Sequence, residues 1–292
     1  MKYWFVLLFS VLMVSKVALA KNFDTARSKI IDEISSMKLD IGVSIVHVES
    51  GESISPNGHK RLPMASVYKF PIAVVLLKRV EDGKMSLDKK ISVTKSDIRG
   101  GYKGPIAKKY PDGGIELSIG TLVKYMVSNS DNSATDLLLK ILGGPKEVTK
   151  VLQKFGFNSI SIDRYEKSLI SEGNRKGELD TSSADELRRL LVKFHAGKLL
   201  NEKNTDLLRK LMTNAKTPGH IAKGLPSNVM QFHKSGWCSE SKCINDVAMV
   251  TLPENKGHLA MAILVSGDIK DTEKISRFIG KIARIAFDSI SK

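Results

Sequence analysis

The sequence predicts an α/β (α+β) fold in which a five-stranded antiparallel sheet with terminal helices carries an inserted all-α domain. Two short runs typical of strands lie near the start of the chain, and three lie near its end. Between them, residues 84–215 show only helical patterns joined by loops. We therefore expect a sheet domain of residues 21–64 and 217–292, with residues 65–216 as the helical domain.

Periodicity and turn residues predict the individual elements. Residues 23–37 repeat apolar side chains at helical spacing, and residues 41–48 alternate as a half-buried strand does. Glu49-Ser50-Gly51 predicts a turn into a short strand at residues 53–54. The other expected elements are strands at residues 229–235, 245–252 and 259–266, a last helix at residues 272–290, and helices that begin near Ser66, Ser118, Asp131, Val148, Thr181 and Asn204.

The first twenty residues have the features of an export signal. Lys2 precedes an apolar run, and Ala18-Leu19-Ala20 supplies a small-residue cleavage pattern. Cleavage after Ala20 would release an exported protein, periplasmic or secreted. Since no later segment is apolar for long enough to span a bilayer, we expect no membrane span.

Composition argues against several classes of function. The net charge is +15, but the lysines are scattered and no aromatic platform lies beside a basic run, so nucleic-acid binding is not expected. The two cysteines and six dispersed histidines lack metal-ligand spacing, and no glycine-rich phosphate loop follows a strand. We expect a monomer without a metal or another cofactor.

The stretch Ser66-Val67-Tyr68-Lys69 is the first candidate for chemistry. A serine and a lysine three residues apart share one face of a helix, and residues 70–77 are almost wholly apolar. A buried lysine can accept the proton of a serine nucleophile, and a helix N-terminus favours developing negative charge. Taken alone, the pattern fits a serine cap on a core helix better.

Two further motifs would complete a binding site. Ser130-Asp131-Asn132 begins a helix, where it is either a simple cap or a second hydroxyl beside an amide. His233-Lys234-Ser235-Gly236 ends a strand and offers a cation and a hydroxyl to a carboxylate. The backbone N–H groups of Ser66 and Trp237 would form an oxyanion hole.

A glutamate in a loop is the last candidate. Glu166 would act as the base for an attacking water, although a surface glutamate is the simpler interpretation. Arg164 and Asp180 flank this loop, and we expect them to pair across its base.

In this order and spacing, the four motifs resemble those of the class A serine β-lactamases. The resemblance covers essentially the whole chain and includes Pro105-Ile106, Tyr110-Pro111-Asp112-Gly113 and Gly143-Gly144-Pro145. It implies an active site in the cleft between two domains and hydrolysis of the β-lactam ring, which gives antibiotic resistance. It also implies catalytic roles for Ser66, Lys69, Ser130 and Glu166, an oxyanion hole at Ser66 and Trp237, and substrate binding by Asn132, Lys234, Ser235 and Gly236.

The sequence departs from the family pattern at several positions. Ile170 replaces a common asparagine and would slow deacylation, and Trp237 replaces a small residue and would narrow the cleft. His220 and Ile244 lie where relatives carry an arginine, so the carboxylate pocket would become more cationic only when His220 is protonated.

The two cysteines of the chain could form a disulfide bond. Some carbapenem-hydrolysing relatives bridge the position of Cys238 to the residue before the nucleophile, which here is Ala65. Four residues separate Cys238 from Cys243, a spacing at which a hairpin brings cross-strand partners within disulfide reach. We therefore expect a Cys238–Cys243 bridge.

Two other functions remain open from the sequence. A penicillin-binding D-Ala-D-Ala peptidase would share the serine and lysine motifs but would lack the glutamate loop. An envelope-binding protein with a dead site would not need all four catalytic positions, which are filled here by Ser66, Lys69, Ser130 and Glu166.

Overall fold

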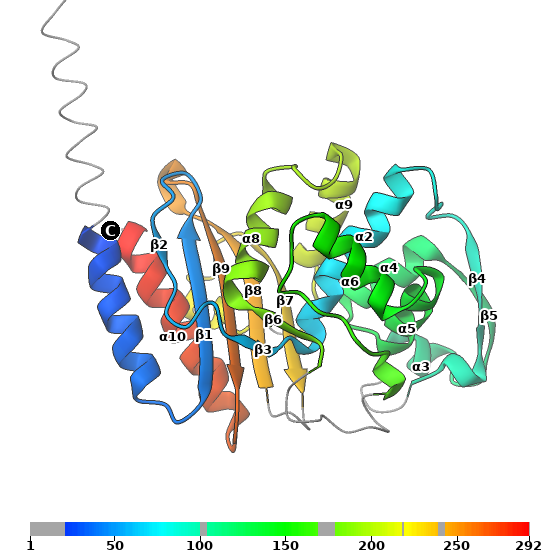
Figure 1. Ribbon diagram of the computed structural model, residues 1–292, viewed down its shortest axis with the longest axis horizontal. Helices are drawn as coiled ribbons and strands as arrows, with labels where there is room; N and C mark the ends of the chain where they lie inside the picture. The colour runs from blue at the N-terminus through cyan, green and yellow to red at the C-terminus, as the bar shows by residue number, and fades with distance from the viewer. Residues whose placement is uncertain (1–20, 100–103, 169–178, 218, 239–242, 292) are drawn as a thin grey trace, which may run out of the picture.

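The computed structural model describes residues 21–99, 104–168, 179–217, 219–238 and 243–291. Five strands form one antiparallel sheet in the order β2-β1-β9-β8-β7 (Figure 1). β1 (Asp40–His47) pairs with β9 (His258–Ser266) along its whole length, which joins the two ends of the chain in one sheet, as predicted. The other strands are β2 (Ser53–Ile54), β7 (Gln231–Cys238) and β8 (Cys243–Thr251).

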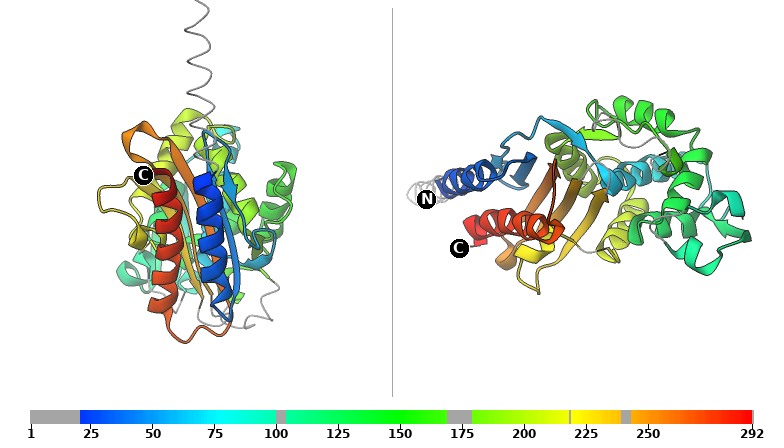
Figure 2. Two further views of the ribbon diagram at one scale, coloured as in Figure 1. Left: turned by 90° about the vertical axis from the view of Figure 1, so that its left-hand side faces the viewer. Right: turned by 90° about the horizontal axis from the view of Figure 1, so that it is seen from below.

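Helices from the two chain ends cover one face of this sheet. The helix of residues 21–35 and α10 (Thr272–Ser291) lie next to each other against the strands (Figure 2). Their apolar side chains pack with alternate strand residues in one buried cluster, which includes Phe23, Ile30, Ile45, Val265 and Ile279. β7 remains the edge strand on the side of the helical segment.

The other face of the sheet is covered by α8 (Ala184–His195), which packs on β1, β8 and β9. Alternate residues of β8 and β9, such as Val247 and Leu264, point into a second cluster that continues through α8 into the helical segment. The sequence assigns α8 to the helical domain, yet its packing makes it a layer of the sheet.

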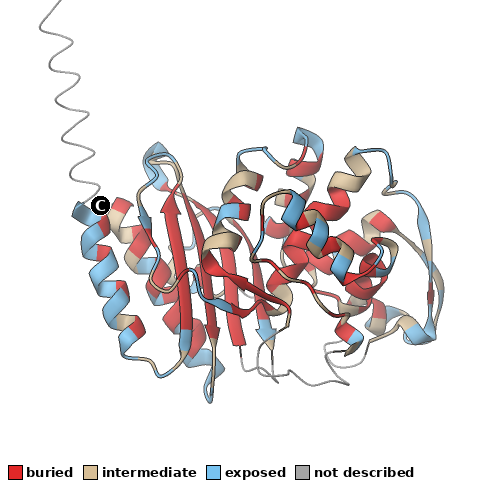
Figure 3. Ribbon diagram, in the orientation of Figure 1, coloured by how far each residue is buried: buried red, intermediate tan, exposed pale blue. Residues whose placement is uncertain are grey.

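The helical segment is built around α2 (Lys69–Glu81), whose residues 69–77 are all buried (Figure 3). A helix that is apolar on every side is stable only in such an interior position. The remaining elements of this part of the chain are η1 (Ala65–Tyr68), η2 (Lys95–Asp97), α3 (Pro105–Lys109), α4 (Ile119–Ser128), α5 (Asn132–Ile141), α6 (Pro145–Lys154) and α9 (Glu202–Thr213). The sheet domain adds η3 (Ile221–Gly224) and η4 (Pro253–Asn255).

The prediction of an all-α middle segment is wrong at three short strands. β4 (Lys90–Thr94) pairs with β5 (Gly113–Ser118), and β6 (Thr181–Ser183) pairs with β3 (Arg61–Pro63). Strands of three to six residues contain too few positions for alternation to show. β3 and β6 also pair residues far apart in the chain, which no local pattern reveals.

Candidate active site

The predicted motifs meet where η1 packs against the edge strand β7. A Cβ atom at Gly236 would lie 2.9 Å from the backbone nitrogens of Ser66 and Val67. Because real Cβ contacts are longer than this, only glycine lets β7 approach the backbone of the nucleophile so closely. The edge strand thus brings the Lys234-Ser235-Gly236 motif to Ser66.

Lys69 is the centre of this arrangement and is fully buried. Its Nζ lies 3.1 Å from Ser66 Oγ and 2.6 Å from Asn132 Oδ1. It also donates to the carbonyl and hydroxyl oxygens of Ser130, at 2.9 and 3.3 Å, and lies 3.0 Å from Glu166 Oε1. One amine therefore connects the predicted nucleophile, the second serine, the amide and the carboxylate.

The local structure of the Ser-x-x-Lys motif differs from the prediction in one respect. Ser66 lies in the 3₁₀ turn η1, and the α-helix begins only at Lys69. Ala65 precedes the nucleophile with a φ of +46°, and Ser130 has a φ of +54°. Left-handed backbone at a residue other than glycine costs about 1–3 kcal/mol and persists where surrounding contacts enforce it. Both strained residues border the Ser66 and Lys69 side chains.

Glu166 is 6% exposed and is held by a residue that the sequence analysis missed. Asp136, on α5, accepts hydrogen bonds from the backbone nitrogens of Glu166 (2.6 Å) and Lys167 (3.1 Å). Arg99 Nε donates to the same carboxylate at 2.6 Å. Burial raises the pKa of Asp136, and the bond from Arg99 opposes this effect. An acidic residue just before Leu137-Leu138-Leu139 was the available signal, since a charge beside a buried helical run needs a partner.

The base of the glutamate loop is closed by the predicted pair. Arg164 Nε lies 2.8 Å from Asp180 Oδ2, and both side chains are buried. The backbone nitrogens of Asp163 and Arg164 donate to the other carboxylate oxygen of Asp180, and Asp163 in turn accepts from the Asp180 nitrogen. Residues 169–178, including Ile170, lie outside the described part of the chain.

Lys234 is the second fully buried lysine of the site. Its Nζ donates to Ser130 Oγ at 3.2 Å and to the Ser235 carbonyl at 2.7 Å. Burial, together with the positive charge of Lys69, lowers the pKa of Lys234 to about 7. The Ser130 hydroxyl thus lies between two amines, where it can relay a proton.

Ser235 and its neighbours form the far side of the site. Ser235 Oγ donates to Thr217 Oγ1 at 3.3 Å, and Thr217 is a contact that the sequence did not reveal. Asp246, with no exposed surface, accepts from the backbone nitrogens of His220 and Ile221 and contacts His233 at 3.3 Å. Its position on β8 opposite Ser235 explains how it supports this strand edge.

The surroundings of His220 limit the pH range in which its imidazole can add positive charge to the carboxylate pocket. His220 Nδ1 is bonded to Ser276 Oγ at 2.8 Å, and burial lowers the pKa of its imidazole. His220 therefore becomes charged only at a lower pH than an ordinary histidine does. Ile244, the other position at which relatives carry an arginine, is 1% exposed.

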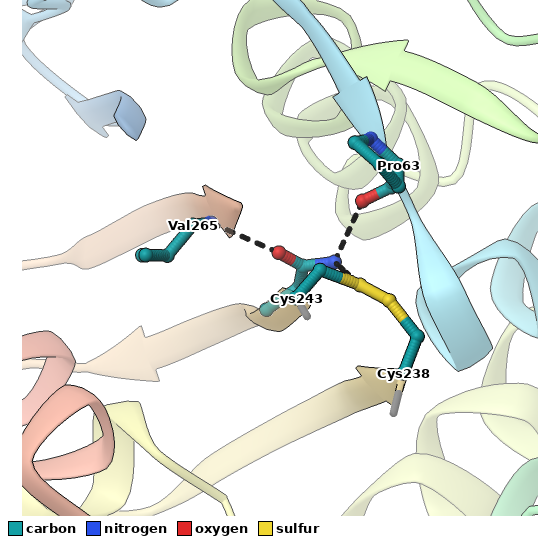
Figure 4. Close-up of a disulfide and its surroundings, with 5 residues drawn as sticks. Pro63, Cys238, Cys243 and Val265 are labelled. Carbon is teal, nitrogen blue, oxygen red and sulfur yellow. Dashed lines mark hydrogen bonds between the residues drawn. A yellow bond between two sulfur atoms is a disulfide. The ribbon is translucent and has the colours of Figure 1, made fainter. Parts of the chain in front are cut away.

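The predicted Cys238–Cys243 disulfide is present (Figure 4). The two residues face each other at the ends of β7 and β8, with a Cα–Cα distance of 5.1 Å. Asn245 is buried, and its Nδ2 lies 3.7 Å from Cys243 Sγ. Its side chain donates to the Pro63 carbonyl (2.8 Å) and accepts from the Val265 nitrogen (3.0 Å). Trp237, directly before the bridge, is 59% exposed.

This geometry suits acyl transfer through a serine. It provides a hydroxyl nucleophile beside an amine, a second hydroxyl as a proton relay, a buried carboxylate and an edge strand packed against the nucleophile. Within the described ranges, no three His, Cys, Asp or Glu side chains gather in a way that could hold a metal ion.

Comparisons with known proteins agree with this chemistry. The model of the β-lactamase enzyme family matches residues 25–290. The VEB-1 β-lactamase of Pseudomonas aeruginosa is 31% identical over 91% of this chain and 90% of its own length. A β-lactamase from Chitinophaga pinensis has a similar structure, with a TM-score of 0.85 and 32% identity over 91% of this chain and 99% of its own. For the TLA-3 extended-spectrum β-lactamase, the TM-score is 0.86 and the identity is 28%, over 92% of this chain and 99% of that one. The chain therefore belongs to the β-lactamase enzyme family, as a class A serine β-lactamase that hydrolyses β-lactam antibiotics.

Proposed function

We propose that Ser66 carries the acyl group during β-lactam hydrolysis and that Lys69 connects the two halves of the reaction. The observation that carries this proposal is the position of Lys69 Nζ, 3.1 Å from Ser66 Oγ and 3.0 Å from Glu166 Oε1. A fully buried amine in contact with both groups can move protons between them without bulk water.

In the first half of the reaction, Ser66 Oγ bonds to the lactam carbonyl carbon and loses its proton to the basic group beside it. The oxyanion accepts hydrogen bonds from the backbone nitrogens of Ser66 and Trp237, since the β7 edge lies against η1. The carbon–nitrogen bond then breaks, and the ring nitrogen takes a proton from Ser130 Oγ. Lys69 and Lys234, at 3.3 and 3.2 Å from that oxygen, replace the proton.

In the second half, Glu166 takes a proton from water, whose oxygen attacks the ester carbon. The bond to Ser66 Oγ then breaks, and that oxygen recovers a proton from Glu166 through Lys69, which contacts both groups. Asp136 and the Arg164–Asp180 pair support this role, because they fix the backbone on which Glu166 is carried. Lys234 and Ser235 bind the substrate carboxylate, and Asn132 holds the substrate amide.

A trapping experiment tests these roles. A Glu166→Ala variant mixed with a chromogenic cephalosporin should give one equivalent of product and a stable adduct, which mass spectrometry of peptides should place on Ser66. Glu147→Ala, which removes an exposed glutamate paired with Lys150, is the control and should turn over normally. Normal turnover by Glu166→Ala would remove Glu166 from the mechanism. One equivalent of product from the wild type itself would favour a penicillin-binding peptidase, and no reaction would favour a binding protein.

We also propose that the protein is exported and acts as a monomer. The basic start, apolar run and Ala18-Leu19-Ala20 pattern support export. In the described part of the chain, no helix is long and apolar enough to cross a membrane. N-terminal sequencing of protein from the periplasmic fraction should begin at Lys21, and light scattering should give the mass of one chain. An uncleaved N-terminus or a doubled mass would contradict these two proposals separately.

A further inference from the structure

Trp237 is unusually exposed for its residue type. It is one of three exposed large hydrophobic residues among the described residues, the others being Ile31 and Met230. An indole ring buries more apolar area on contact than almost any other side chain, and exposed tryptophans are enriched where proteins bind partners. The proposed mechanism uses only the backbone nitrogen of Trp237, so its side chain has no assigned role.

The side chain of Trp237 lies on the same face of the edge strand as that of Ser235. Side chains at positions two apart on a strand point to the same face and are about 7 Å apart, whereas Lys234 and Gly236 point to the opposite face. Across the ladder Trp237 pairs with Ile244, whose side chain is 1% exposed. The indole therefore stands next to Ser235, one of the two residues proposed to bind the substrate carboxylate.

The backbone around Trp237 is held firmly from both sides. Gly236 is pressed against the η1 backbone, and the Cys238–Cys243 disulfide closes the ladder directly after Trp237. An aromatic side chain on a fixed backbone loses little conformational entropy when a ligand stacks on it. The position therefore combines exposure, rigidity and closeness to the reacting groups.

We infer that the Trp237 indole is a stacking platform that selects β-lactams with a flat aromatic substituent beside the carboxylate of the fused ring. The inference rests on the proposed binding of that carboxylate by Lys234 and Ser235. With that carboxylate at Ser235, an aromatic substituent on the neighbouring ring atom is long enough to span the ~7 Å to the indole on the same face of β7. A methyl group in its place is too small to cover the indole.

The test uses two cephalosporins with the same acylamido side chain. One carries a styryl group next to the carboxylate, attached through carbon so that ring opening does not expel it, and the other carries a methyl group. The measured quantity is the ratio of the two kcat/KM values, which cancels any general effect of a mutation on the backbone. Trp237→Ala should reduce the preference for the styryl compound about 3- to 10-fold, the range expected for one aromatic pair.

Three variants separate aromatic stacking from the size of the side chain and from nonspecific effects. Trp237→Phe should retain most of the preference, whereas Trp237→Leu, with similar apolar character but no ring, should lose it. Met230→Ala removes a side chain that is 73% exposed at the other end of β7 and should leave both kcat/KM values unchanged. An unchanged ratio in Trp237→Ala, or equal ratios for the leucine and phenylalanine variants, would overturn the inference. Failure of the wild type to hydrolyse either compound would instead overturn the proposed function.

Fluorescence gives an independent measurement. The chain has two tryptophans, Trp4 and Trp237, so a Trp4→Phe protein reports on Trp237 alone. In that background, the Glu166→Ala acyl-enzyme formed with the styryl compound should show stronger quenching of indole emission than the methyl acyl-enzyme. Equal quenching by the two acyl groups would show that the ring does not reach the indole, and would also overturn the inference.

Discussion

The two sides of the candidate active site, helical and strand, each bury one lysine completely, and the surroundings of these lysines differ. On the helical side, Lys69 lies 3.0 Å from the Glu166 carboxylate. On the strand side, the described hydrogen bonds of Lys234 go to neutral oxygens, those of the Ser130 hydroxyl and the Ser235 carbonyl. The charge of Lys69 is therefore balanced within the protein, while the charge of Lys234 remains available to an anion from solution. Under the proposed function, the comparison distinguishes a lysine that only moves protons from one that also binds the substrate carboxylate.

The largest expected effect comes from removing the internally balanced lysine. Lys69→Ala should lower kcat/KM for a chromogenic cephalosporin by at least about 1,000-fold, because it removes the group that connects Ser66, Ser130 and Glu166. Stopped-flow absorbance under single-turnover conditions measures the loss. Lys78→Ala is the matched control on the same helix, since Lys78 makes partly exposed pairs with Glu81 and Asp82. A loss below tenfold in Lys69→Ala would show that Lys69 does not carry the proton.

The support of Glu166 gives the next largest effect, on stability. Asp136→Ala should lower the free energy of unfolding by about 3–5 kcal/mol, because it leaves Arg99 and two backbone N–H groups without their acceptor in a buried site. Urea denaturation followed by circular dichroism measures the change. Asp206→Ala, which breaks an exposed pair with Arg209, should change stability by less than about 1 kcal/mol. Equal effects of the two substitutions would mean that the buried hydrogen bonds of Asp136 do not stabilise the helical segment.

On the strand side, the disulfide should have a smaller effect on stability. Replacing both Cys238 and Cys243 by serine should cost about 2 kcal/mol, the chain-entropy value for so short a loop. The same denaturation experiment on oxidised wild type and on the double variant gives this difference. Stability unchanged within about 0.5 kcal/mol would show that the ladder holds this end of β7 without the bridge.

The smallest effect is the most direct test of the comparison. With a pKa of about 7 in place of 10.5, Lys234 is protonated below neutral pH and loses its charge as the pH rises. For an anionic substrate, kcat/KM should therefore fall above pH 7, by about tenfold for each unit once Lys234 is mostly neutral. Lys234→Arg should abolish this decline, because a guanidinium stays charged. A decline that persists in Lys234→Arg would assign it to another group.

Elements that depend on the local sequence were predicted better than contacts between residues far apart in the chain. The five main strands and most helices were predicted because their alternation or helical periodicity is a local property of the sequence. The small sheets β3–β6 and β4–β5 were missed, since short strands carry weak patterns. Asp136, Thr217 and Asp246 were also missed, because each acts through a partner that is far away in the chain.

The sequence alone determined the order of the motifs, the pairing of Cys238 with Cys243 and the residues that compose the site. A serine, an amine, a carboxylate and a glycine at those positions could be recognised from residue type and spacing. Tertiary structure decided how they act. It placed one buried lysine against a carboxylate and, among the described hydrogen bonds, gave the other only neutral oxygens, and it left the Trp237 side chain exposed. Burial and the distances between charges set these properties, and both arise only when distant parts of the chain pack together.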